Sequence, residues 1–217
     1  LLRHWLAQGR RVWAVDLADP EQPRDLGPGL RFEGEVDALA VEGTLGLAAV
    51  GEDLWALNLA DALAPKLGGR LTLPRPRGSS EALSVRRILI HQQAAYVQTE
   101  CWLDLPDQTT EDPIGSIAVV DLRRPAEPRL AVEALLSVST GSGIEDLQRV
   151  GAALAVLVRG GMASAPSFDD GYSVRLFDLR RPLAPKEAAR IEDPSLDRGT
   201  AHLLAQRQTP LGPRLVL

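Results

Sequence analysis

One ten-residue phrase recurs four times along this chain of 217 residues, and it constrains the fold more than any other feature. Each copy has two apolar residues, Asp or Asn, Leu, two small or polar residues, Pro or Ala, two further residues and Pro. Seven positions separate the Asp or Asn, which we term the anchor residue, from the last proline in every copy. The four anchor residues are Asp16, Asn58, Asp121 and Asp178. A phrase repeated at fixed internal spacing indicates a repeat architecture.

The phrase is typical of a strand that runs into a turn. An Asp or Asn side chain can accept a hydrogen bond from the backbone two residues later, which favours the start of a turn. The prolines fix extended backbone geometry and exclude a helix across the phrase. The sequence therefore predicts strands over residues 12–17, 54–59, 117–122 and 174–179, each followed by a turn and another extended segment.

The surrounding residues extend each phrase into a unit of four short strands. In the second unit the predicted strands are residues 36–41, 45–50, 54–59 and 66–73. The third unit repeats them at residues 83–90, 94–99, 117–122 and 129–136, and the fourth at residues 144–150, 154–158, 174–179 and 186–191. The anchor residues lie 42, 63 and 57 positions apart, with the excess over about 40–45 residues placed in loops. This pattern predicts an all-β fold, a partial β-propeller of about four to five four-stranded antiparallel blades.

The expected domain organisation is a single β-propeller domain, or part of one, over residues 1–217. Its units cover residues 1–34 (partial), 35–78, 79–140, 141–196 and 197–217 (partial). The chain opens on Leu1 and ends on a strand-like segment, so we expect it to be a piece of a longer protein.

Three segments carry many helix-forming residues and suggest an α/β alternative. They are residues 81–93, 143–158 and 185–193. The first two fall at the repeat position of residues 35–50, where Gly43, Thr44 and Gly46 predict a hairpin. We therefore predict strands in all three segments.

The copies around Val15-Asp16-Leu17 and Val120-Asp121-Leu122 resemble the LVIVD repeat, an apolar run ending in Asp and followed by a proline turn. The resemblance covers nearly the whole chain, with Asp19-Pro20 and Pro23 as its closest match. The chain departs from the pattern at Asn58, at Ala62 and at the arginine pairs 123–124 and 180–181. The resemblance implies a β-propeller of bacterial or archaeal type, often exported or attached to the cell surface. It brings no catalytic residues with it.

Two long insertions lie between the second and third strands of neighbouring units. They are residues 100–116 and 159–173, where the second unit has only Gly51-Glu52-Asp53. Both should emerge on the face opposite the proline turns, and long loops carrying aromatic residues are typical of contact surfaces. The candidate binding residues are Trp102, Asp104, Asp107, Glu111, Asp112, Phe168, Asp169, Asp170 and Tyr172. The alternative is neutral surface growth, because lengthening a loop costs little.

Cofactor and metal sites are not predicted. Clustered carboxylates can hold calcium, but neither insertion has a calcium-loop spacing, so solvated acidic loops are favoured. The histidines His4, His91 and His202 are isolated and lack zinc-site spacing. The lone Cys101 excludes an intramolecular disulfide and is expected to be partly covered.

Other residues have structural interpretations. Trp13 and Trp55 occupy the same repeat position, which favours packing between blades. The arginine pairs fall in equivalent turns and are expected to be solvated charge. A net charge of −5 with dispersed cations gives no reason to expect nucleic acid as a partner. No apolar run approaches the roughly 18 residues of a membrane span.

Two functions follow from this pattern. The favoured one is a non-catalytic binding module that presents the long-loop face to a protein or glycan partner. The alternative is a hydrolase or lyase with its site at the central channel of the propeller. The polar residues that the first strands offer to such a channel are Asp37, Arg86, Arg87, Glu145, Asp146 and His202.

Overall fold

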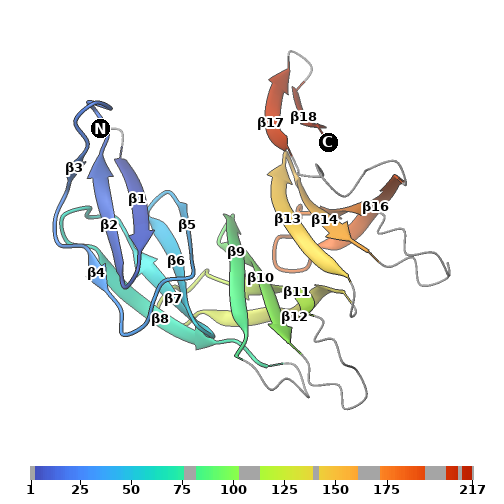
Figure 1. The fold of residues 1–217 in the computed structure, drawn as a ribbon, viewed down its shortest axis with the longest axis horizontal. Coiled ribbons are helices and arrows are strands. Elements are labelled where there is room, and N and C mark those ends of the chain that lie inside the picture. The colour runs from blue at the N-terminus through green and yellow to red at the C-terminus, as the bar shows by residue number, and fades with distance from the viewer. Residues whose placement is uncertain are drawn as a thin grey trace.

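The structure is a computed structural model that describes residues 3–75, 82–102, 113–138, 142–160, 172–193, 204–209 and 212–216. All regular elements in these residues are β-strands, and the strands form antiparallel sheets. Figure 1 shows the sheets following one another along an arc in chain order. The all-β prediction of successive four-stranded blades is confirmed. No helix that is long and apolar enough to span a membrane occurs in the described part of the chain.

One sheet lies within each predicted unit, and we number the units one to five in chain order. Unit one contains β1 (Arg3–Gln8), β2 (Arg11–Asp16), β3 (Arg24–Asp25) and β4 (Leu30–Arg31). Unit two contains β5 (Ala38–Glu42), β6 (Leu45–Val50), β7 (Asp53–Asn58) and β8 (Lys66–Thr72). Unit three contains β9 (Ser84–His91), β10 (Ala94–Trp102), β11 (Pro113–Asp121) and β12 (Arg129–Ser137). Unit four contains β13 (Gly143–Val150), β14 (Ala153–Arg159), β15 (Tyr172–Asp178) and β16 (Lys186–Asp193), and unit five contains β17 (Leu204–Thr209) and β18 (Gly212–Val216).

Units two, three and four are simple meanders in which each strand pairs with the next one in the chain. In unit one β2 is the central strand and pairs with β1, β3 and β4. The first strands β5, β9 and β13 contact one another in succession, so they form the inner side of the arc. The segments rich in helix formers are strands, as the repeat register predicts: β9, β13, β14 and β16 contain most of their residues.

The strands beside the two insertions are longer than the sequence indicates. β10 and β11 remain paired without interruption up to Trp102 and Pro113, whereas the pairing of β10 with β9 has a bulge between Gln98 and Thr99. β14 and β15 remain paired up to Arg159 and Tyr172. The pairing continues because Cys101, opposite Ile114, is buried and extends the apolar core. The predicted insertions of residues 100–116 and 159–173 are therefore too long at both ends.

The predicted turn chemistry is present at all four anchor residues. Each anchor oxygen Oδ1 accepts a hydrogen bond from the backbone N–H two residues later, at Ala18 (3.0 Å), Ala60 (3.1 Å), Arg123 (2.9 Å) and Arg180 (2.9 Å). In three units a backbone hydrogen bond also closes the turn. The N–H of Gln22 donates to the carbonyl of Asp19, that of Glu127 to Arg124, and that of Ala184 to Arg181. The side-chain bond at the start of the turn is therefore common to all four copies, and the backbone bond that closes the turn is common to units one, three and four.

The proline turn of one unit packs against the preceding unit. The carbonyl of Pro125 in unit three accepts a hydrogen bond of 2.7 Å from the N–H of Gly69 on β8. The carbonyl of Pro182, at the equivalent position of unit four, accepts a 2.8 Å bond from the Tyr96 hydroxyl on β10. Burial raises the pKa of Tyr96 to about 12, so this hydroxyl keeps its proton. The turns thus join neighbouring units as well as reversing the chain.

The hydrophobic core lies between successive sheets, because the side chains of a strand alternate between its two faces. On β10, Ala95 and Val97 pack with residues of unit two, whereas Ala94 and Tyr96 pack with residues of unit four. On β7, Leu54 and Ala56 face the core shared with unit three, and Leu57 faces the one shared with unit one. A strand buried on both faces has continuous apolar sequence rather than alternation.

Gly69 provides a test of this joint between units. A Cβ at residue 69 would collide with the backbone carbonyl of Ala126 and lie 2.5 Å from the ring of Pro128. We expect Gly69→Ala to lower the free energy of unfolding by about 1–3 kcal/mol, because backbone atoms must move to make room. Gly143→Ala is the matched control, since only the ends of the Glu145 and Arg159 side chains come near there. Equal urea midpoints for the two variants would contradict the packing described.

Candidate functional site at the long-loop end

The strand ends that carry the two insertions lie at one end of units three and four, which we call the long-loop end. Here β10 ends and β11 begins at a paired Trp102 and Pro113, and β14 ends and β15 begins at a paired Arg159 and Tyr172. The proline turns lie at the other end of the same sheets, which we call the turn end. Two neighbouring units thus start their long connections at the same end.

Most of the candidate binding residues lie outside the described residues. These are Asp104, Asp107, Glu111, Asp112, Phe168, Asp169 and Asp170. Trp102 is the last residue of β10, and its side chain is not among those described. Tyr172 is the first residue of β15 rather than a loop residue. Its side chain is buried with Ala155, Leu157 and Val174, so it is a core residue in this structure.

The seam between units three and four is polar below these strand ends. Arg87 on β9 pairs with Asp146 on β13, and Asp146 is only 6% exposed. The same carboxylate accepts hydrogen bonds from the Leu147 N–H (2.8 Å) and from the Gln148 amide (3.3 Å). The buried amide of Gln98 donates to the carbonyl of Ile144 at 2.6 Å and also crosses the seam. These contacts satisfy a carboxylate that would otherwise be costly to bury.

Two further ion pairs lie within the sheets at the same end. Arg86 on β9 pairs with Glu100 on β10, and Arg159 on β14 pairs with Glu145 on β13 at 2.6 Å. Beside them, the hydroxyls of Thr99 and Ser116 share a hydrogen bond of 2.7 Å. Both pairs are at least a quarter exposed on each side chain, so they fix geometry more than they add stability.

Four of the residues expected at a channel site therefore meet at one place, but as ion pairs. Arg86, Arg87, Glu145 and Asp146 each bind an opposite charge on a neighbouring strand. Asp37 belongs to unit two, where it accepts a 2.8 Å hydrogen bond from the Gly51 N–H, and His202 lies outside the described residues. A general acid or base needs a titratable group within reach of a substrate proton. These carboxylates are held by arginines instead, an arrangement suited to orienting strand ends.

No group of three or more metal-binding side chains occurs among the residues that the structure describes. Cys101 is buried beside the site, and burial together with the neighbouring Glu100 raises the pKa of its thiol. A protonated thiol is a poor nucleophile and a poor metal ligand. The chemistry available at the described long-loop end is therefore charge pairing and hydrogen bonding.

A second polar group crosses three units at the turn end. The Nδ1 atom of His91, at the end of β9, lies 3.1 Å from a guanidinium nitrogen of Arg149 on β13 and 3.9 Å from a carboxylate oxygen of Glu42 on β5. Burial is the main cause that lowers the pKa of His91, and the positive charge of Arg149 lowers it further. The negative charge of Glu42 acts in the opposite direction and raises this pKa. Sequence reasoning treated His91 as isolated, because its partners come from other units.

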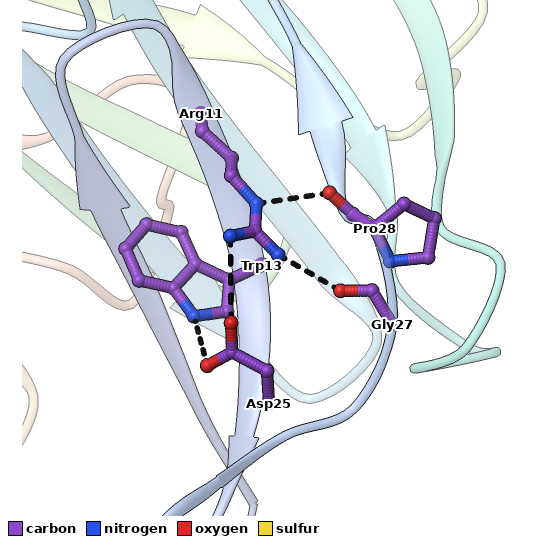
Figure 2. Close-up of polar contacts among 5 residues, drawn as sticks. All are labelled: Arg11, Trp13, Asp25, Gly27 and Pro28. Carbon is purple, nitrogen blue, oxygen red and sulfur yellow. Dashed lines mark hydrogen bonds and ion pairs between the residues drawn. The ribbon is translucent and has the colours of Figure 1, made fainter.

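The tryptophans of the repeat position differ in their surroundings. Trp55 packs edge-on against Phe32 of unit one, with ring centres 6.3 Å apart, so it lies between units as predicted. Trp13 is held within its own unit (Figure 2). Its indole N–H donates to Asp25 at 2.9 Å, and the Arg11 guanidinium lies 4.7 Å from the ring centre. Arg11 also donates to the carbonyls of Gly27 and Pro28, both at 2.9 Å. This group fastens the segment between β3 and β4 to β2.

Comparison with known proteins adds no assignment: no family model matches the chain, and no curated protein matches it significantly.

The seam provides a stability test with a matched neighbour. Asp146→Asn removes the charge that Arg87 binds. It is expected to lower the free energy of unfolding by about 1–3 kcal/mol, because the carboxylate is buried and its hydrogen bonds are charge-assisted. Glu145→Gln breaks an exposed pair and should cost less than about 1 kcal/mol. Urea unfolding of both variants measures the difference, and equal losses would show that the seam is not stabilised by Asp146.

His91 makes stability depend on pH. Its pKa in the folded chain is below the ordinary 6.5, so the unfolded chain binds more protons in the window just below that value. Stability is therefore fully present above about pH 6.5 and should fall as the pH decreases through it. Melting curves should show a smaller loss for His91→Gln than for the unaltered chain, while His4→Gln should keep the full loss. A His91→Gln variant with an unchanged pH profile would contradict the assignment.

Proposed function

We propose that this protein is a non-catalytic interaction module of the repeat-propeller type that presents its long-loop end to a protein or glycan partner. The observation that carries the proposal is that β10–β11 and β14–β15, in neighbouring units, both extend to the same end. Long connections on a rigid scaffold are a common location for binding residues. The charged residues near these strand ends, Arg86, Arg87, Glu145 and Asp146, are occupied in ion pairs, which favours a binding role over a catalytic one.

We also propose membership of the LVIVD-repeat proteins. The support is that all four anchor residues accept the same side-chain hydrogen bond, which is the role expected of the Asp that precedes the proline turn in that repeat. Membership would favour an exported or surface-attached bacterial protein. An alignment of homologues tests this, and anchor positions that vary freely among them would count against it.

The alternative function is a hydrolase or lyase at a central channel. The observation in its favour is Asp146, a buried acid on a first strand. It would require the pair with Arg87 to open when substrate binds. An enzyme of this kind would lose its activity in Asp146→Asn and retain its activity when the loops are shortened.

The binding proposal predicts that shortening the loops removes partner binding and leaves the fold intact. Residues 103–112 or 160–171 are replaced by the two-residue connection Gly-Glu, which joins the paired Val50 and Asp53 in unit two. Each strand pair keeps its register, because a Gly at the first turn position suits a two-residue hairpin. Partner recovery in a native pull-down, binding to a glycan array and melting curves are then compared with the unaltered chain.

Trp102→Ala refines the same experiment. An anchor aromatic contributes about 2 kcal/mol or more, so affinity should fall at least about tenfold. Tyr172→Phe is the matched control, because this ring is in the core and only its hydroxyl is lost. Unchanged recovery by both shortened variants, with unchanged melting, would place the binding surface elsewhere.

A further inference from the structure

A charged pocket lies at the turn end of unit three, away from the long-loop end. It has a volume of about 450 Å³ and is lined by Asp121, Arg123, Arg124, Glu127 and Arg129. This volume lies in the range of about 300–1,000 Å³ found for small-molecule sites. Because all of these described lining residues are charged, the pocket suits a polar and ionic ligand rather than an apolar one.

The two acidic residues of the pocket are already neutralised. Asp121 accepts a bidentate pair from Arg123, with N–O distances of 3.0 and 2.6 Å. The hydrogen bonds from Arg123 hold the pKa of the Asp121 carboxyl below its ordinary value. Arg129 pairs with Glu127 at 3.0 Å. Arg124 forms no ion pair with the residues that the structure describes, so its positive charge is the net charge of the pocket.

The backbone that carries these arginines is fixed before any ligand binds. The Arg123 N–H is bonded to the anchor Asp121, and the Glu127 N–H is bonded to the Arg124 carbonyl at 2.8 Å. The Pro125 carbonyl is bonded to Gly69 of unit two. Because this backbone is already ordered, little conformational entropy of the turn is lost when a ligand binds.

The turn of unit four is a natural comparison. It has the same arginine pair, and Arg180 binds its anchor Asp178 at 2.7 Å. Ala184 and Lys186 stand where unit three has Glu127 and Arg129. The second arginine fork is therefore a feature of unit three, since lysine presents a point charge and no planar fork.

We propose that the pocket of unit three binds a phosphate or sulfate ester of a small polar molecule. The free guanidinium of Arg124 and the unpaired N–H groups of Arg123 and Arg129 supply several donors around one tetrahedral anion. Guanidinium groups match such oxyanions by bidentate hydrogen bonds. The polar lining would receive a sugar or similar hydroxylated group attached to the anion.

The test uses glucose 6-phosphate and glucose 6-sulfate as probes, with glucose as the uncharged control, in calorimetric titrations of the full 217-residue chain. Both esters, or one of them, should bind saturably and glucose should not; the ester preferred identifies the source of the anion. Arg124→Gln should weaken binding about tenfold, because a charge-assisted contact is lost. This exposed substitution should leave the melting temperature unchanged.

Arg181→Gln, at the equivalent position of unit four, is the matched control and should leave ester affinity unchanged. The proposal is overturned if neither ester binds saturably at millimolar concentration, or if glucose binds as well as its esters. It is also overturned if Arg181→Gln weakens binding as much as Arg124→Gln, since that would show non-specific attraction to basic turns.

Discussion

The hydrogen bond from a backbone N–H to the anchor side chain two residues earlier is the interaction on which the rest of this structure depends. It ends one strand of each of the first four units at a defined residue and starts the turn that follows with the same side-chain contact. Because the turn is fixed, the carbonyl at the following proline position points away from its own unit. At Pro125 and Pro182 that carbonyl accepts a bond from the preceding unit. A local turn preference thereby becomes a contact between units.

The contact between units explains where the core lies. In units two, three and four the second strand is buried on both faces, as the opposite packing of Val97 and Tyr96 on β10 shows. No unit can bury its apolar surface alone, so each relies on its neighbours, as in other repeat proteins. Gly69 permits the close approach, since it lies where a side chain would meet the backbone of the next turn. The packing of units two and three and the geometry of the proline turn therefore depend on the same contact.

The two ends of the sheets carry different chemistry. At the long-loop end, arginines and carboxylates pair across strands and across the seam, next to the strand ends from which the two long connections leave. At the turn end of unit three, the pairs at Asp121 and Glu127 neutralise the acids, and the charge of Arg124 remains for a ligand. The same type of ion pair thus supports a surface at one end and shapes a pocket at the other.

The sequence by itself determined the strands, their order and the turn chemistry, because these depend on residues close together in the chain. The anchor at Asp121 and the prolines after it specify a turn whatever surrounds them, and the repeat register identified β9 and β13 as strands despite their helix formers. The tertiary structure decided which side chains contact one another across units. That Arg87 meets Asp146, that His91 meets Arg149, and that Tyr172 is buried depend on how units pack. These contacts join residues tens of positions apart, and many charged residues would satisfy the local pattern equally well. Only the packed sheets select which of them come within hydrogen-bond distance.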